Sequence, residues 1–188
     1  MAIDTGGPVL CVAPLVPGAG VDTLLTAFGL LCADRPALRL EVIGSGPQEA
    51  LRGHVRALGL EERVRFRGRL RAAPLRTVLS QCSMLVLPRR EDDTGPDGGL
   101  PSVLLQAMAS GVPVVSTDLV GSPDRLRQDA TGLHVPPDVP TGLAAAMATL
   151  LDDPARAAEV GATGRRLVAS FRDREGPAGW DGRRHQVG

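Results

Sequence analysis

The residues best suited to chemistry lie in one polar loop, residues 89–99, which separates two apolar runs. The loop holds Arg89 and Arg90, one glutamate, three aspartates and three glycines. Residues 100–102 follow as the expected first turn of a helix, whose backbone N–H groups have no partner within the helix. Such N–H groups, with guanidinium groups nearby, favour an anion such as a phosphate. The loop is therefore a candidate binding site.

The segments around this loop must hold it at the edge of a sheet. Residues 84–87 form an apolar run closed by Pro88, and residues 112–115 form a second buried run. The short helical run between them, residues 102–110, ends at Gly111. A strand, a loop, a helix and a strand make a βαβ unit with parallel strands. Because open α/β sheets bind ligands at the carboxyl ends of their strands, the polar loop is expected at a ligand-binding edge.

The rest of the chain repeats the alternation of strand and helix, which predicts an α/β fold with a doubly wound parallel sheet. We expect one Rossmann-like domain over residues 9–171, an N-terminal tail over residues 1–8 and a flexible C-terminal tail over residues 172–188. The other strands are expected at residues 9–13, 38–43, 63–71 and 132–135, and the other helices at residues 21–33, 51–58, 75–82, 143–151, 153–171 and from Ser122 onward.

Composition argues against several classes of protein. The 188 residues carry 21 basic and 21 acidic side chains, so the formal net charge is zero, unlike a general nucleic-acid or membrane binder. No apolar run reaches the roughly 20 residues that span a bilayer, and the start MAIDTGGP lacks the features of a secretory signal. The three cysteines lie in apolar runs and are expected to be buried thiols. We therefore expect a cytoplasmic protein.

Two glycine motifs are weaker candidates for a nucleotide site. Gly18 and Gly20 follow a strand as in a dinucleotide fingerprint, but Thr23 stands where the third glycine belongs. Gly44 and Gly46 begin a second incomplete motif. Both are expected to be tight turns, which argues against a nicotinamide-dependent oxidoreductase. The histidines and cysteines lack the spacing of a metal site, so no metal is expected.

Basic and apolar residues alternate over residues 63–71. No aromatic platform accompanies the basic side chains, so a solvated sheet edge or a partner-docking surface is expected rather than a nucleic-acid site. His54 is expected on the solvated side of its helix, and His134 is expected to be structural within a short strand. The alternating basic residues are Arg63, Arg65, Arg67, Arg69 and Arg71.

Seven segments in order, from residue 9 to about residue 171, carry a resemblance to a known family. They read APLVPGAGVDTLLTAF, LEVIGSGP, LGLEERVRFRGRL, SMLVLP, GGLPSVLLQAMASGVPVVSTD, VGSPD and TGLHVPPDVPTGLAAAMATLLDDP. Together they resemble the C-terminal, donor-binding half of family 4 (group 1) glycosyltransferases of the GT-B fold. The resemblance implies a domain that binds a nucleotide diphospho-sugar at the carboxyl edge of its sheet. It also implies a separate acceptor-binding N-terminal domain, transfer with retention of configuration, and no metal or other cofactor.

The sequence departs from that family at its usual donor contacts. By resemblance, an Arg and a Lys of the first loop hold the diphosphate, and these positions are Pro14 and Ala19. Two Glu separated by seven residues hold the sugar and the ribose, and these positions are Gly98 and Gln106. Gln106 can still bond a ribose hydroxyl as a neutral group. Asp97 lies one residue out of register with the first Glu position.

Backbone groups and nearby arginines are the remaining candidates for binding the donor. Arg89 or Arg90 either reaches a phosphate and replaces a lost cation, or both are solvated loop residues. The expected backbone contacts are Gly20 and Gly44 in tight turns, Arg69 and Leu70 beside the donor base, and Gly99, Leu100, Ser102 and Val103 at the helix N-terminus.

Two functions stay open from the sequence. In the first, the chain is the donor-binding half of a glycosyltransferase and acts with an acceptor-binding N-terminal domain or partner protein, as a fragment or as half of a split enzyme. In the second, it is a degenerate relative that survives as a binding or scaffold subunit without turnover. Each lost cation removes a charge-assisted bond of roughly 1.5–3 kcal/mol. Because the acceptor domain and the four usual donor-contact side chains are missing, the isolated chain is expected to be inactive.

Overall fold

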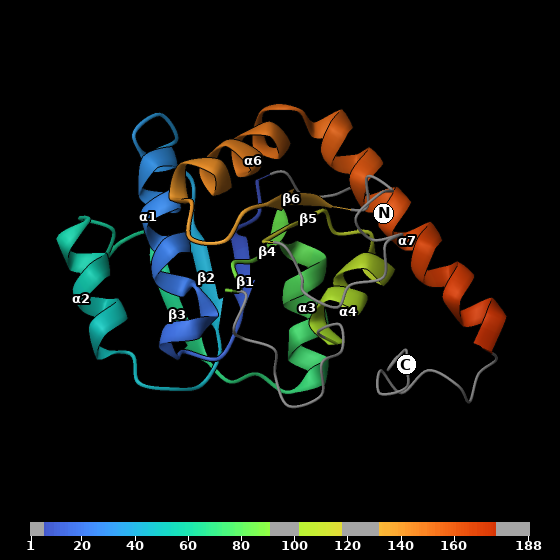
Figure 1. Ribbon diagram of the computed structural model, residues 1–188, viewed down its shortest axis with the longest axis horizontal. Helices are drawn as coiled ribbons and strands as arrows, with labels where there is room; N and C mark the ends of the chain where they lie inside the picture. The colour runs from blue at the N-terminus through green and yellow to red at the C-terminus, as the bar shows by residue number, and fades with distance from the viewer. Residues whose placement is uncertain (1–5, 91–101, 118–131, 176–188) are drawn as a thin grey trace.

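The expected strands form one parallel sheet in the computed structural model (Figure 1), which describes residues 6–90, 102–117 and 132–175. The strand order is β3-β2-β1-β4-β5-β6, and each neighbouring pair is parallel. The order reverses between β1 and β4, which confirms the doubly wound α/β fold. The strands are β1 (Val9–Val12), β2 (Leu40–Ile43), β3 (Val64–Gly68), β4 (Met84–Leu87), β5 (Val114–Thr117) and β6 (Leu133–Val135).

Strand position in the sheet explains the sequence patterns. All four residues of β4 are buried, because helices cover both faces of a central strand. In β3, at the edge, buried and exposed residues alternate instead. β5 begins two residues later than its apolar run because Pro113 has no N–H to donate to the sheet, although its carbonyl accepts from Leu85 N–H at 3.0 Å.

Helices pack on both faces of the sheet (Figure 1). α1, α2 and α6 lie on one side, α3 and α4 on the other, and α7 contacts both α6 and α4. Among the residues that the structure describes, none of these helices combines the length and apolarity needed to cross a membrane. The helices are the short 3₁₀ helix η1 (Pro17–Ala19), α1 (Val21–Cys32), α2 (Glu49–Ala57), α3 (Ala72–Gln81), α4 (Ser102–Ser110), α6 (Pro140–Asp152) and α7 (Pro154–Glu175).

The last helix is longer than its apolar pattern indicates. α7 continues to Glu175, four residues past Phe171. Residues 172–175 are charged residues that a helix tolerates, and the helix breakers Gly176 and Pro177 come only after them. The tails at residues 1–5 and 176–188 and the helix expected near Ser122 lie outside the described residues.

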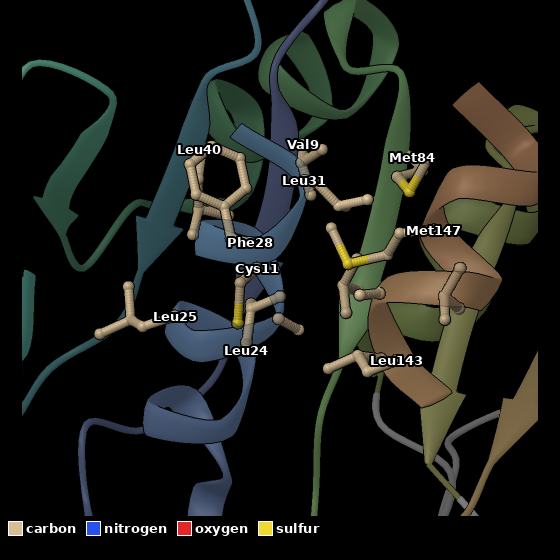
Figure 2. Packing of buried hydrophobic residues seen from close by; sticks show 14 of the residues in the cluster. Val9, Cys11, Leu24, Leu25, Phe28, Leu31, Leu40, Met84, Leu143 and Met147 are labelled. Atoms are coloured by element: carbon tan, nitrogen blue, oxygen red, sulfur yellow. The ribbon is translucent and has the colours of Figure 1, made fainter. Parts of the chain in front are cut away.

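Buried apolar side chains form two clusters, one on each face of the sheet. Alternate strand residues enter opposite clusters, because successive side chains of a strand point to opposite faces. Figure 2 shows the larger cluster, in which α1 and α6 pack against the strands. It includes Val9, Cys11, Leu24, Phe28, Met84, Leu143 and Met147, and the smaller cluster includes Leu10, Leu79, Leu85, Leu87 and Met108.

The three cysteines are buried free thiols, as expected. Burial raises the pKa of Cys11 and of Cys82 to about 12. It also raises the pKa of Cys32. Because the thiolate is the reactive form, these side chains contribute packing rather than nucleophilic chemistry at neutral pH.

Candidate functional site

Two glycines allow the loops at the carboxyl ends of the strands to lie in close contact. Gly20 has φ +70°, and a Cβ at this position would lie 1.7 Å from the carbonyl oxygen of Pro88. A Cβ at Gly44 would lie 1.8 Å from the carbonyl oxygen of Ala13. The Gly44 N–H also donates to the carbonyl oxygen of Gly68 at 3.0 Å. Gly20 therefore occupies a left-handed turn, as the sequence indicates, whereas Gly44 is a position of close backbone contact after β2.

The two positions that resemblance assigns to diphosphate-binding cations lie in the first of these loops. Pro14 is exposed and offers no charge. Ala19 is fully buried, and its side chain belongs to the larger apolar cluster. The loop from β1 to α1 therefore supplies no cation of its own.

Arg90 supplies a cation to this loop from the end of the neighbouring strand β4. Its Nη2 donates to Asp22 Oδ2 at 2.9 Å and to Thr23 Oγ1 at 3.4 Å. Its Nε donates to Asp138 Oδ1 at 2.6 Å, and its Nη1 donates to the carbonyl oxygen of Pro17. Thr23 Oγ1 in turn donates to Asp138 Oδ1 at 3.0 Å. We call these five residues the Arg90 junction, since they join the β1–α1, β4–α4 and β6–α6 loops.

The charges of the Arg90 junction perturb one another. The hydrogen bond to Asp22, followed by that to Asp138, raises the pKa of the Arg90 guanidinium. The hydrogen bond from Arg90 holds the pKa of Asp138 below its usual range. The carboxylate side chains are 46% and 55% exposed, so each ion pair contributes little to stability by itself. Two carboxylates against one guanidinium leave the junction with one formal negative charge.

Two further features fix the junction. Asp138 has φ 55°, a left-handed conformation that Asp tolerates better than most side chains. On the other side, the buried Thr117 at the end of β5 donates its hydroxyl to the carbonyl oxygen of Arg89. The Arg90 side chain is therefore 23% exposed and paired with two carboxylates, rather than simply solvated.

The N-terminus of α4 is the second part of the candidate site. α4 begins at Ser102, as expected, and Ser102 is exposed. Gln106 is half-buried and lies one turn later on the same side of the helix. Val103 packs into the smaller apolar cluster, so only its backbone could meet a ligand. The candidates Asp97, Gly98, Gly99 and Leu100 lie outside the described residues.

The expected contacts to the donor base follow β3, at the end of the sheet. Arg69 is exposed, and Leu70 is half-buried against the smaller apolar cluster. β2 separates β3 from β1. The contacts described for the Arg90 junction do not include either residue. The structure brings the loop that holds Pro14, Ala19 and Gly20 against residues 88–90, through Pro17, Gly18 and Gly20, and leaves Arg69 and Leu70 apart.

The strand expected over residues 63–71 is shorter, since β3 ends at Gly68, and Arg69 and Arg71 follow it on the way to α3; the arginines on the strand form a solvated edge, as expected. Arg65 and Arg67 are exposed on β3, and Arg67 pairs with Glu41 at 2.9 Å. Arg63 instead turns toward α1 and donates to the carbonyl oxygens of Cys32 and Arg35, both at 3.1 Å. Arg63 therefore satisfies carbonyl groups at the C-terminus of α1.

The two histidines within the expected domain hold neighbouring elements together. His134 Nδ1 lies 3.1 Å from Ser116 Oγ, between β6 and β5, which fits its expected structural role. His54 is half-buried rather than fully solvated, and its Nε2 lies 3.2 Å from Thr26 Oγ1 of α1. Within the described ranges, no group of three or more His, Cys, Asp or Glu is placed to hold a metal ion.

The Arg90 junction contains the residues that sequence reasoning missed. Asp22, Thr23 and Asp138 match no donor position of the resembled family. Their common signal is position: Asp22 and Thr23 lie in the first turn of the helix after β1, and Asp138 closely follows β6, so all three lie on the carboxyl side of the sheet, where α/β sheets place functional groups. Their pairing with Arg90 was not visible, because 48 residues separate Asp138 from Arg90.

Comparison with known proteins identifies the family. The family model described as "Glycosyl transferases group 1" matches residues 7–153. A GDP-mannose-dependent monoacylated alpha-(1-6)-phosphatidylinositol monomannoside mannosyltransferase of Corynebacterium glutamicum is 36% identical over 166 residues, which cover 88% of this chain and 43% of that protein. The chain thus spans less than half the length of this curated relative.

Solved structures give the same fold. The C-terminal domain of the group 1 glycosyltransferase LpcC from Francisella tularensis has a TM-score of 0.76 at 19% identity, over 87% of this chain and 85% of that one. A mutant of TarM from S. aureus, solved with fondaparinux, alpha-GlcNAc-glycerol and UDP, has a TM-score of 0.77 at 20% identity, over 89% of this chain and 33% of that one. The chain belongs to the group 1 glycosyltransferases and corresponds to the C-terminal half of their GT-B fold.

Proposed function

We propose that the chain is the nucleotide-sugar-binding half of a retaining glycosyltransferase, whose acceptor is held by an N-terminal domain or partner protein. The family match over residues 7–153 carries this proposal. The relative named for GDP-mannose makes GDP-mannose the first donor to test. The structure of TarM with UDP makes UDP-sugars the second class.

The chain's own groups suit a donor bound largely through main-chain amides. The N-terminus of α4 follows β4, so the first N–H groups of this helix, which have no partner within the helix, and the positive end of its dipole are expected at the carboxyl edge. These groups favour the negative charge that the leaving diphosphate gains during transfer. Gln106, one turn into α4, offers a neutral hydrogen-bonding group for a ribose hydroxyl. No metal or other cofactor enters this proposal.

A second candidate function is a binding or scaffold subunit without turnover. Pro14 and Ala19 carry no charge, and Arg90 is paired with Asp22 and Asp138. None of these three positions therefore offers an uncommitted cation to a diphosphate. This arrangement favours weak donor binding by the isolated chain.

Two measurements separate these functions. Titration calorimetry with GDP, UDP and GDP-mannose gives micromolar affinity for a donor-binding half, and millimolar or no binding for a scaffold. Transfer from a panel of donors is then assayed with and without a candidate N-terminal half from the same gene neighbourhood. Absence of transfer in every combination overturns the enzymatic proposal.

A matched pair of variants locates the binding. Gln106→Ala is expected to weaken nucleotide binding, since it removes the group proposed for the ribose. Gln81→Ala removes the same side chain from the exposed C-terminal end of α3, near the opposite, amino edge of the sheet, and should leave affinity unchanged. Equal effects of the two variants would place the nucleotide elsewhere.

A further inference from the structure

The guanidinium of Arg90 is almost fully used by the chain itself. A guanidinium has five N–H donors. Four of them meet acceptors within the junction: one at Nε, one at Nη1 and both at Nη2. A phosphate could bind Arg90 in the usual two-pronged manner only by displacing Asp22 or Asp138. The displaced carboxylate would then face the phosphate as a like charge.

The backbone around Arg90 is held as firmly as its side chain. The Arg90 N–H donates to the carbonyl oxygen of Gly18 at 3.4 Å. Pro88 lies directly against Gly20, where no side chain fits, and Thr117 binds the carbonyl oxygen of Arg89. The start of the β4–α4 loop is thus fixed between the β1–α1 loop and the end of β5.

We propose that Arg90 is a positioning residue of the donor site: it sets the relative placement of the β1–α1, β4–α4 and β6–α6 loops, and donor affinity depends on that placement. Arg90 does not bind the phosphate in this arrangement. Its effect on the loops is independent of the ligand, whereas its effect on the donor rests on the proposed function.

The direction in which two substitutions change nucleotide affinity distinguishes positioning from phosphate binding. If Arg90 bound phosphate and its carboxylates merely competed, Asp138→Asn would release Arg90 and strengthen nucleotide binding. If Arg90 positions the loops, Arg90→Gln removes the connection to Asp138, and Asp138→Asn weakens it because the amide oxygen still accepts but carries no charge. Both variants should then weaken binding, and the double variant should be little worse than Arg90→Gln alone, because interactions within one network are not additive.

The test combines hydrogen exchange with calorimetry on the full chain. Arg90→Gln and Asp138→Asn should each speed amide exchange in peptides covering residues 15–24 and 133–142. Each should also raise the Kd for GDP or UDP by roughly threefold to thirtyfold, the range expected for coupled sites in one network. Arg90→Lys keeps the charge but not the planar guanidinium, so its exchange rates and nucleotide affinity should lie between those of Arg90→Gln and those of the natural chain.

A second ion pair provides the matched control. Arg35 donates to both carboxylate oxygens of Asp152 at 2.7 Å, at the amino edge of the sheet. Arg35→Gln should change neither the exchange of the two loop peptides nor nucleotide affinity. This control shows whether the loss of any arginine ion pair is enough to speed amide exchange and weaken nucleotide binding.

Defined results overturn the inference. Stronger nucleotide binding by Asp138→Asn or Asp22→Asn would identify Arg90 as a phosphate ligand. Unchanged exchange of both loop peptides in Arg90→Gln would show that Arg90 does not position them. If the natural chain binds no nucleotide, the claim that Arg90 affects donor affinity fails together with the proposed function. The exchange data alone then decide whether Arg90 positions the loops.

Discussion

The hydroxyl of Thr23 donates to the carboxylate of Asp138 at 3.0 Å, although 115 residues separate them in the sequence. Thr23 lies in the first turn of α1, and Asp138 lies just before α6. These two helices pack against each other on the same face of the sheet. The bond therefore fixes how their N-terminal ends meet at the carboxyl edge.

Asp138→Ala should destabilise the fold more than Asp138→Asn. Alanine removes both hydrogen bonds and also resists the left-handed backbone at φ 55°. Asparagine tolerates that conformation and keeps one acceptor oxygen. Urea unfolding should show a loss of about 1–3 kcal/mol for alanine and a smaller loss for asparagine. Equal losses would mean that the backbone conformation contributes nothing.

The stability difference between the natural chain and Asp138→Asn should depend on pH. The hydrogen bond from Arg90 lowers the pKa of Asp138 in the folded state. The stability that the Asp138 carboxylate contributes is therefore fully present above the pKa of the unfolded state, near 4, and is lost as the pH falls through the lower pKa of the folded state. Asp22 shares the same Arg90, and Thr23 is uncharged. Unfolding at pH 7, 5, 4 and 3 should show the difference shrinking below about pH 4, and a constant difference would contradict this.

Gly44→Ala should be far more harmful than Gly59→Ala. A Cβ at Gly44 would overlap the carbonyl oxygen of Ala13, so two strand ends would have to separate. Gly59 has φ +66° but no atom within 4 Å of its Cβ position, so alanine there meets only backbone strain. Thermal unfolding should show that Gly44→Ala lowers the free energy of unfolding by roughly 1–3 kcal/mol or more. For Gly59→Ala we expect a loss of about 1 kcal/mol in the free energy of unfolding.

Arg165→Met should loosen the contact between α4 and α7. Its Nη2 donates to the carbonyl oxygen of Ser110 at 2.8 Å, at the C-terminal end of α4. Methionine keeps most of the aliphatic stem and loses this bond, at a cost of about 0.5–1.5 kcal/mol. Arg166→Met is the control, since the hydrogen bond described for Arg166 goes to Thr163 on its own helix. Denaturant unfolding that gives equal losses for both would remove the proposed capping role.

Gly98→Glu combined with Gln106→Glu should strengthen donor binding if the family's spacing of these positions is kept. The resemblance places carboxylates at both positions, for the sugar and the ribose. Calorimetry with GDP-mannose against GDP separates a gain at the sugar from a gain at the nucleoside. No gain with either ligand would show that the loop has lost the family register.

Local patterns in the sequence were enough to predict most of the fold. The run at residues 102–110 gave the bounds of α4, because the helix ends at Gly111, whose φ is +75°. The apolar run of β4 indicated a buried strand with a parallel neighbour, and the alternation of β3 indicated a solvated edge. Residues a few positions apart determine such features, so the chain itself displays them.

The candidate site was predictable only in part. The turn at Gly20 and the start of α4 were expected, because glycine and helix N-termini have local signatures. Arg90 was noticed as a cation, but its two acidic partners, in the first turn of α1 and in the loop before α6, lie far along the chain in both directions. Only the strand order places these loops side by side.

The sheet ends at β3 in an open row of backbone groups. Open rows of this kind invite strands from other molecules to add on, and charged side chains oppose such addition. A second copy approaching β3 edge to edge would set Arg65 and Arg67 against their own equivalents. Repulsion between these like charges protects a chain without net charge from growing into fibrils through this strand.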